Sequence, residues 1–183
     1  MPIFNFLRKN GLGFTLIELL VAITILGILS TIALSSFRSS QMRSRDAKRK
    51  SDLKQIANAL EMFYSDKGFY PSSYNGKILG CPYYSSTTPS ICQWGAPDYN
   101  SEFRDADRDV LYFKSLPKDP GGFSYYYVSN GQSFRLFAHL ENDKDQNCIN
   151  SDCSATGVPV GNNCNGSCNF AITSANVTPK DAL

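Results

Sequence analysis

One feature constrains this sequence more than any other: Phe14–Leu34 is a 21-residue apolar stretch that carries a single charge, Glu18. As a helix it would span about 31 Å, close to the roughly 30 Å hydrocarbon core of a bilayer. The stretch is longer than the apolar region of a secretory signal peptide, and no A-x-A-like cleavage site follows it. We therefore predict a transmembrane segment, with a signal peptide and an uncleaved signal anchor as the alternatives.

The charges and cysteines around this stretch predict its orientation. Arg8 and Lys9 precede it, and positive residues favour the cytoplasmic side of a membrane. All six cysteines lie beyond residue 80, which fits disulfides in an oxidising compartment. We expect the N-terminus in the cytoplasm and the rest of the chain outside it.

The charge balance gives little support to nucleic-acid binding, because the formal net charge is only +2. Basic residues nevertheless cluster after the apolar stretch. They are Arg38, Arg43, Arg45, Lys48, Arg49, Lys50 and Lys54. Between DNA binding and a solvated helix face that contacts acidic headgroups or neighbouring subunits, we favour the second. With no nucleophile–base arrangement or phosphate-binding loop in the sequence, we do not expect an enzyme.

The sequence GFTLIELLV, which starts at Gly13, and ILGIL at Ile25–Leu29 resemble the N-terminal processing and methylation signature of type IV pilins and type II secretion pseudopilins. The resemblance implies that a prepilin peptidase cuts between Gly13 and Phe14 on the cytoplasmic side and methylates Phe14. Residues 1–13 would then be a cleaved leader.

The same resemblance implies that Glu18 pairs with the N-terminal amine of a neighbouring subunit during assembly. A lone carboxylate costs about 2.5–3.5 kcal/mol at the centre of a bilayer and less toward its edge, and a cationic partner reduces that cost. We therefore expect the loss of Glu18 to spare membrane insertion and impair assembly. The alternative is an unpaired Glu18, either reaching the membrane interface or neutral.

A second apolar pattern extends the helix beyond the membrane. Apolar residues at three- and four-residue spacing form one stripe, and polar residues lie on the opposite face. The stripe is Leu53, Ile56, Ala57, Leu60, Phe63 and Tyr64, and the polar face is Arg49, Lys50, Asp52, Lys54 and Asn58. Because no Gly or Pro lies between Ile28 and Lys67, we predict one helix over Phe14–Ser65, ended by Gly68.

Ser35 departs from the family pattern, because many relatives have a proline just after the apolar segment. A proline would remove a backbone hydrogen-bond donor and loosen the helix. Its absence predicts a straighter helix, or melting that depends on Gly27 and the Ser30/Thr31 pair.

Residues 68–122 are predicted to be a variable loop region, in which Tyr74–Val110 forms a polar, aromatic-rich insertion without periodicity. Cys81 and Cys92 predict a disulfide that closes a small loop there and contributes up to about 3 kcal/mol. We expect Trp94 to pack against the helix rather than to form a platform for a ligand.

Two strand patterns, Ser124–Ser129 and Ser133–Leu140, flank Asn130-Gly131 and predict a hairpin, because both turn residues tolerate positive φ. One face of the second strand should pack on the helix. His139 is the only histidine, and we expect it on the outer face of that strand.

Four further cysteines, Cys148, Cys153, Cys164 and Cys168, form C-x4-C and C-x3-C pairs. Zinc is the alternative to disulfides, but the usual C-x2-C spacing is absent. We predict two disulfides and leave open whether they form within each short loop or across the two. Cys168–Thr173 is a candidate for the last strand.

Asp143, Asp145 and Asn147 occupy alternate positions, a spacing that can direct side-chain oxygens at one hard cation. An EF-hand would need Gly next and Glu at the end of the loop, where this chain has Cys148 and Ser154. The family resemblance supports calcium, since major pseudopilins bind it in a loop after this hairpin. Calcium is therefore the candidate cofactor, and a solvated turn is the alternative.

Asp52–Ser73 and Tyr112–Gly122 resemble the major pseudopilin of type II secretion more than an adhesive pilin. The expected fold is α+β and pilin-like: a long N-terminal helix, half transmembrane and half amphipathic, packs against a small antiparallel sheet. The segments are a leader (1–13), a transmembrane helix (14–34), an amphipathic helix (35–67), the variable region with its disulfide (68–122), and the sheet with a Cys-rich C-terminal region (123–183).

The expected function is that of a major pilin or pseudopilin, which polymerises through its N-terminal helix into a type IV pilus-like or type II secretion filament. The alternative is a minor pilin whose 74–110 insertion caps the fibre and captures DNA or a surface. Expected partners are further copies of the chain, prepilin peptidase, an inner-membrane assembly platform and minor pilins or pseudopilins, with no specific nucleic acid. The precursor would lie in the inner membrane, and the filament in the periplasm or outside the cell.

Overall fold

The computed structural model describes residues 13–96, 101–149, 153 and 163–180. It divides into two compact units, residues 1–41 and 42–183, which are described separately. The elements are α1 (Leu16–Lys67), β1 (Ser73–Tyr74), β2 (Lys77–Ile78), β3 (Phe103–Asp105), β4 (Val110–Phe113), β5 (Tyr126–Ser129), β6 (Phe134–Ala138) and β7 (Phe170–Thr173). The α+β fold class is confirmed, with three small antiparallel sheets in place of the single sheet expected.

Helix α1 is continuous, as the sequence predicted, and it runs through Gly27 and Ser35 without a break. Within the first unit, the Ser30 hydroxyl donates to the carbonyl of Leu26 at 2.7 Å, so this polar group is satisfied by its own helix. At the other end Gly68 has a φ of +79° and donates its N–H to the Tyr64 carbonyl at 2.7 Å. A left-handed glycine is a common helix terminator.

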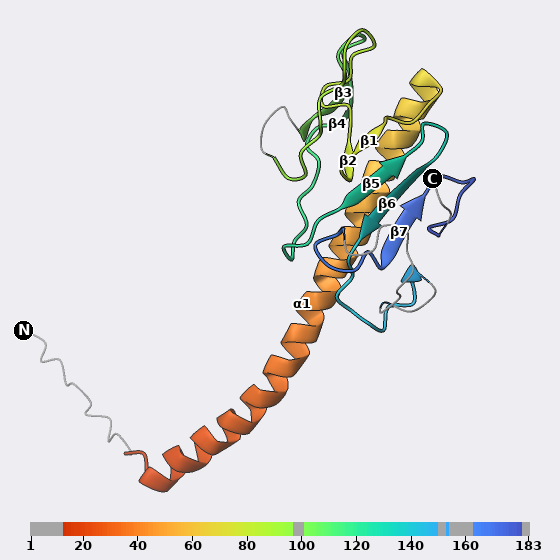
Figure 1. Ribbon diagram of the computed structural model, residues 1–183. Coiled ribbons are helices and arrows are strands. Elements are labelled where there is room, and N and C mark those ends of the chain that lie inside the picture. The colour runs from red at the N-terminus through yellow and green to blue at the C-terminus, as the bar shows by residue number, and fades with distance from the viewer. Residues whose placement is uncertain (1–12, 97–100, 150–152, 154–162, 181–183) are drawn as a thin grey trace, which may run out of the picture. The chain divides into compact units, whose positions relative to one another are not determined.

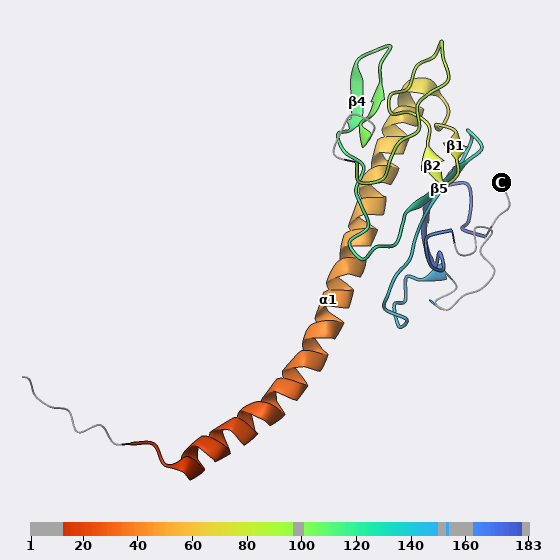
Figure 2. The same ribbon diagram turned by 60° about the vertical axis from the view of Figure 1, so that its left-hand side comes forward.

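The main sheet has the order β5-β6-β7 and lies beside the C-terminal half of α1 in both views (Figures 1 and 2). The first two strands form the expected hairpin, with Tyr127 opposite Leu136 and Ser129 opposite Phe134. Its loop has four residues, 130–133, where the expected strand bounds left three. Asn130 closes this loop, because its side-chain oxygen accepts the N–H of Ser133 at 2.9 Å.

The core of the second unit confirms the apolar stripe of α1. Leu53, Ile56, Leu60 and Phe63 are fully buried there. They share one hydrophobic cluster with side chains that include Tyr127, Phe134 and Leu136 of the sheet and Tyr125 just before it.

Strand β6 is buried along its whole length, so its second face is covered as well as the one expected to pack on the helix. Phe137 belongs to a second cluster with Ile149, Cys164 and Cys168, which covers the other face. His139 follows the strand and is half-buried, with Nδ1 2.8 Å from the carbonyl oxygen of Ser167. The return of the chain from residue 163 onward therefore provides the second layer.

Two short hairpins that the sequence did not indicate, β1-β2 and β3-β4, overlap the 74–110 insertion and extend slightly beyond both of its ends. Phe63 of α1 lies at ring-centroid distances of 5.1 Å from Tyr83, 5.3 Å from Phe103 and 5.3 Å from Tyr112. The Lys67 ammonium pairs at 2.6 Å with Asp105, whose side chain is fully buried. The insertion is thus packed against the end of α1.

Candidate functional sites

The first candidate site is the start of α1, where Thr15 and Glu18 form a capping box. The Glu18 carboxylate accepts the Thr15 N–H at 2.8 Å and the Thr15 hydroxyl at 2.6 Å, and the Thr15 hydroxyl oxygen accepts the Glu18 N–H at 3.3 Å. These bonds satisfy backbone donors that a helix start leaves unpaired. The T-x-x-E spacing of Thr15 and Glu18 is the sequence signature of this pattern, which was not among the expectations above.

Apolar side chains surround this carboxylate. Phe14 is 79% exposed, and it lines a shallow groove beside Glu18 together with Ile17, Val21 and Ile25. Among the described residues, one helix is long and apolar enough to cross a membrane, α1, with a mean hydropathy of 2.4 in its most apolar window. This length and composition fit the predicted transmembrane segment.

The second candidate site is a buried charge network around Arg49 in the second unit. The Arg49 side chain is fully buried, whereas the sequence placed it on the polar outer face. Its guanidinium pairs with Asp46 at 2.7 Å, with Asp119 at 2.6 Å and with Glu141 at 2.7 Å. It also lies 5.2 Å from the centre of the Phe123 ring. Arg49 therefore joins α1 to two other segments of the chain, those that carry Asp119 and Glu141.

The network also shapes the loop that leads into β5. Asp119 accepts the N–H groups of Gly121 at 2.7 Å and Phe123 at 3.2 Å. A Cβ on Gly121 would lie 2.3 Å from an Arg49 nitrogen, so only glycine allows the loop this close to the guanidinium. The Asp46–Arg49 spacing of three residues was the available sequence signal.

Next to this network, Arg45 and Glu141 form a two-pronged ion pair. Arg45 Nε lies 2.9 Å from one carboxylate oxygen of Glu141, and Nη2 lies 2.5 Å from the other. Hydrogen bonds from Arg45, and then from Arg49, outweigh the effect of burial and hold the pKa of Glu141 at about 2, against an ordinary 4.5.

Acid should weaken the fold through Glu141. Because its pKa is lower in the folded chain, ionised Glu141 stabilises the fold above about pH 4.5, and this contribution is lost as the pH falls toward about 2. We expect this contribution to the free energy of unfolding to be about 1–2 kcal/mol, a value reduced to allow for solvent screening of a partly exposed pair. Denaturant unfolding of the full chain in detergent at several pH values measures it.

The Glu141→Gln variant should be less stable at pH 7 and lose less stability between pH 4.5 and 2. Glu102→Gln is the matched control, since Glu102 lies 3.7 Å from Arg104 outside this network. Identical acid profiles for the native chain and the Glu141 variant would contradict this assignment.

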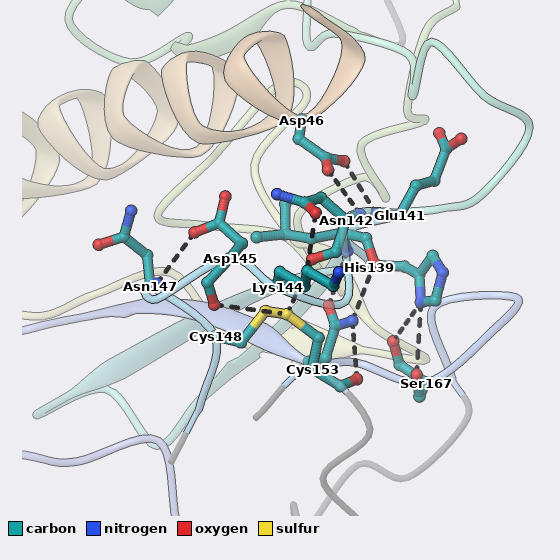
Figure 3. The surroundings of a disulfide bond; sticks show 12 residues. Asp46, His139, Glu141, Asn142, Lys144, Asp145, Asn147, Cys148, Cys153 and Ser167 are labelled. Carbon is teal, nitrogen blue, oxygen red and sulfur yellow. Dashed lines mark hydrogen bonds between the residues drawn. A yellow bond between two sulfur atoms is a disulfide. The ribbon is translucent and has the colours of Figure 1, made fainter. Parts of the chain in front are cut away.

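The three residues predicted to bind calcium, Asp143, Asp145 and Asn147, follow Glu141 of this network along the chain. Figure 3 shows two of them, Asp145 and Asn147. Asp143 and Asn147 are exposed, whereas the carboxylate of Asp145 pairs with Lys50 of α1 at 2.6 Å. Burial by itself raises the pKa of Asp145. Hydrogen bonds from Lys50 and from the N–H of Asn147 lower it by more, so the pKa lies below its ordinary value. No group of three or more His, Cys, Asp or Glu side chains in the described part of the chain is arranged to hold a metal ion.

All six cysteines are paired, and the pairing that the sequence left open lies within the short loops. The disulfides are Cys81–Cys92, Cys148–Cys153 and Cys164–Cys168. Trp94, in the insertion, packs edge-on against Tyr125 at a ring-centroid distance of 5.8 Å.

Comparison with known proteins matches residues 8–34 to the prokaryotic N-terminal methylation motif. The type II secretion system core protein G of Aeromonas hydrophila is 34% identical over 68% of this chain and 78% of its own length. The core protein G of Pseudomonas aeruginosa is 32% identical, with the same two coverages. That of Escherichia coli K12 is 32% identical over 66% of this chain and 73% of its own length. No solved structure matches the chain.

The long N-terminal helix, the small antiparallel sheets and the methylation motif together define the pilin-like class of subunits. Within that class, the relatives named above are all type II secretion core protein G. The chain belongs to this family, the major pseudopilin. The alternative of a minor pilin with a capturing insertion is not favoured by these relatives.

Proposed function

We propose that this chain is the major structural subunit of a type II secretion pseudopilus. The observation that carries the proposal is the exposed apolar half of α1 with one carboxylate near its start, in a chain that resembles core protein G along two thirds of its length. Such a surface is stable only in lipid or against other apolar helices. A bundle of these helices, one from each subunit, is the core of the proposed filament.

Processing precedes assembly in this proposal. Prepilin peptidase cuts between Gly13 and Phe14, and Phe14 receives the methyl group. Gly13 has open space around its Cα, and both residues lie just before the helix begins. The new amine on Phe14 then provides the cation that Glu18 of a neighbouring subunit requires. The role of the chain is structural, and the chemistry of cleavage belongs to the peptidase.

The proposed location follows from the same helix. The precursor is anchored in the inner membrane with its N-terminus in the cytoplasm, and residues 42–183 lie on the other side. Proposed partners are copies of the chain, the peptidase, an assembly platform and minor pseudopilins. The disulfides fit this side of the membrane, because thiols are kept reduced in the cytoplasm.

Coexpression of the chain with a prepilin peptidase tests the processing step. Mass spectrometry should find a mature chain that lacks residues 1–13 and begins with methylated Phe14. Gly13→Val should leave the precursor uncut, since the peptidase would have to accommodate a branched side chain just before the cut, where the chain now has none. Gly11→Val serves as the control. A mature chain that begins elsewhere would refute the assigned cleavage site.

A further inference from the structure

The loop that follows β6, residues 141–149, is the place where the spacing of Asp143, Asp145 and Asn147 predicts calcium, and the structure shows it anchored by other means. Its start is held by Asp46 of α1, which accepts the N–H groups of Glu141 at 3.0 Å and Asn142 at 2.9 Å. Its middle is held by the ion pair of Asp145 with Lys50. The loop is therefore tied to the helix at two points, and Figure 3 shows the first of them, at Asp46.

A calcium ion would need several oxygens of this loop at about 2.3–2.6 Å. The carbonyl oxygens of Asn142 and Asp145 instead lie 3.1 Å and 3.5 Å from Sγ of Cys153 (Figure 3). A disulfide sulfur carries no proton to donate, so these are packing contacts in which the sulfur occupies the space before both carbonyls.

The carboxylate of Asp145 is also engaged on both oxygens. One accepts from the Lys50 ammonium at 2.6 Å, and the other accepts the N–H of Asn147 at 2.9 Å. A cation at this position would have to displace Lys50, whose charge already neutralises the carboxylate. The described residues of the loop therefore do not fit a calcium site.

We propose that the Cys148–Cys153 disulfide, together with the Lys50–Asp145 ion pair, takes the structural place of a bound cation in this loop. The cross-link joins Cys148 to Cys153 beside the carbonyls of Asn142 and Asp145, and both cysteines are nearly fully buried. The fold of residues 42–183 then depends on the oxidation state of this pair and not on calcium.

The test uses the full chain in detergent, with thermal unfolding followed by circular dichroism and loop opening followed by hydrogen–deuterium exchange. Excess EGTA and millimolar CaCl2 should each leave the melting temperature of the native chain unchanged, and calorimetric titration with CaCl2 should give no binding heat. Replacing Cys148 and Cys153 with serine should lower the melting temperature by roughly 5–10 °C and speed exchange of the amides in 141–149.

The matched control is the chain with Cys164→Ser and Cys168→Ser, which removes a disulfide of similar span and should leave exchange in 141–149 slow. If the Cys148/Cys153 variant does not fold, the EGTA and CaCl2 measurements on the native chain still decide. Calcium binding by the native chain, destabilisation by EGTA, or unchanged loop exchange without the Cys148–Cys153 disulfide would overturn the proposal. None of these outcomes depends on whether the subunit polymerises.

Discussion

Glu18→Ala should abolish filament assembly while the chain still inserts into the membrane and is still cleaved after Gly13. In the single subunit the carboxylate is satisfied locally by Thr15, so insertion does not require a second chain. In a bundle of helices, the amine of Phe14 on each subunit needs a counter-charge in a low-dielectric environment, where an unpaired charge is costly. Alanine removes that partner and leaves the amine unpaired.

Electron microscopy of sheared filaments and membrane fractionation measure the two properties separately. Glu18→Asp should retain part of the assembly, because it keeps the charge on a shorter side chain. Thr24→Ala is the matched control in the same apolar half, since the Thr24 hydroxyl bonds only to the Val21 carbonyl of its own helix at 2.7 Å. Normal filaments from the Glu18→Ala chain would end the pairing model.

Arg49→Met should destabilise the folded domain by about 3–5 kcal/mol, the range measured when one partner of a buried ion pair is removed. Three carboxylates, on Asp46, Asp119 and Glu141, would lose their shared cation. Of these, Asp46 and Asp119 are almost fully buried and would remain as uncompensated charges. A large part of the stability of a typical domain would be lost.

Denaturant unfolding of the full chain in detergent measures the loss of stability caused by Arg49→Met. Protease resistance in cells shows whether the variant is degraded faster as a result. Lys54→Met is the control on the same helix, because Lys54 is exposed and its change should stay within about 0.5 kcal/mol. Arg49→Lys should recover only part of the loss, as an ammonium cannot reproduce the forked contacts with Asp119. A loss below about 1 kcal/mol for Arg49→Met would contradict the central role of the network.

The long helix, its end at Gly68 and the hairpin around Asn130 could be predicted because each depends on residues close together in the sequence. An apolar stripe indicates the periodicity of a helix, and a glycine after it indicates that the helix ends there in a left-handed conformation. The assignment of Glu18 came from a motif of the same local kind. Local patterns of this sort need no knowledge of what packs against them.

Arg49 lies four residues before Leu53 and seven before Ile56, so helix periodicity puts it on the buried stripe, although its charge had suggested the polar face. Its partners Asp119 and Glu141 could not be predicted, because they lie 70 and more residues away. The aromatic contacts of Phe63 with the 74–110 insertion and the covered second face of β6 are non-local in the same sense.

The sequence by itself determined that this chain has a membrane-length helix with one carboxylate, a processing motif and a disulfide-bearing domain beyond them, since composition and short-range spacing carry that information. The tertiary structure alone decided which carboxylates pair with Arg49, and whether the last four cysteines pair within their two short loops or across them. The partners of Arg49 are remote in sequence, and the choice of disulfides depends on the distance between the two loops. Only packing the sheet and its loops onto α1 sets those distances.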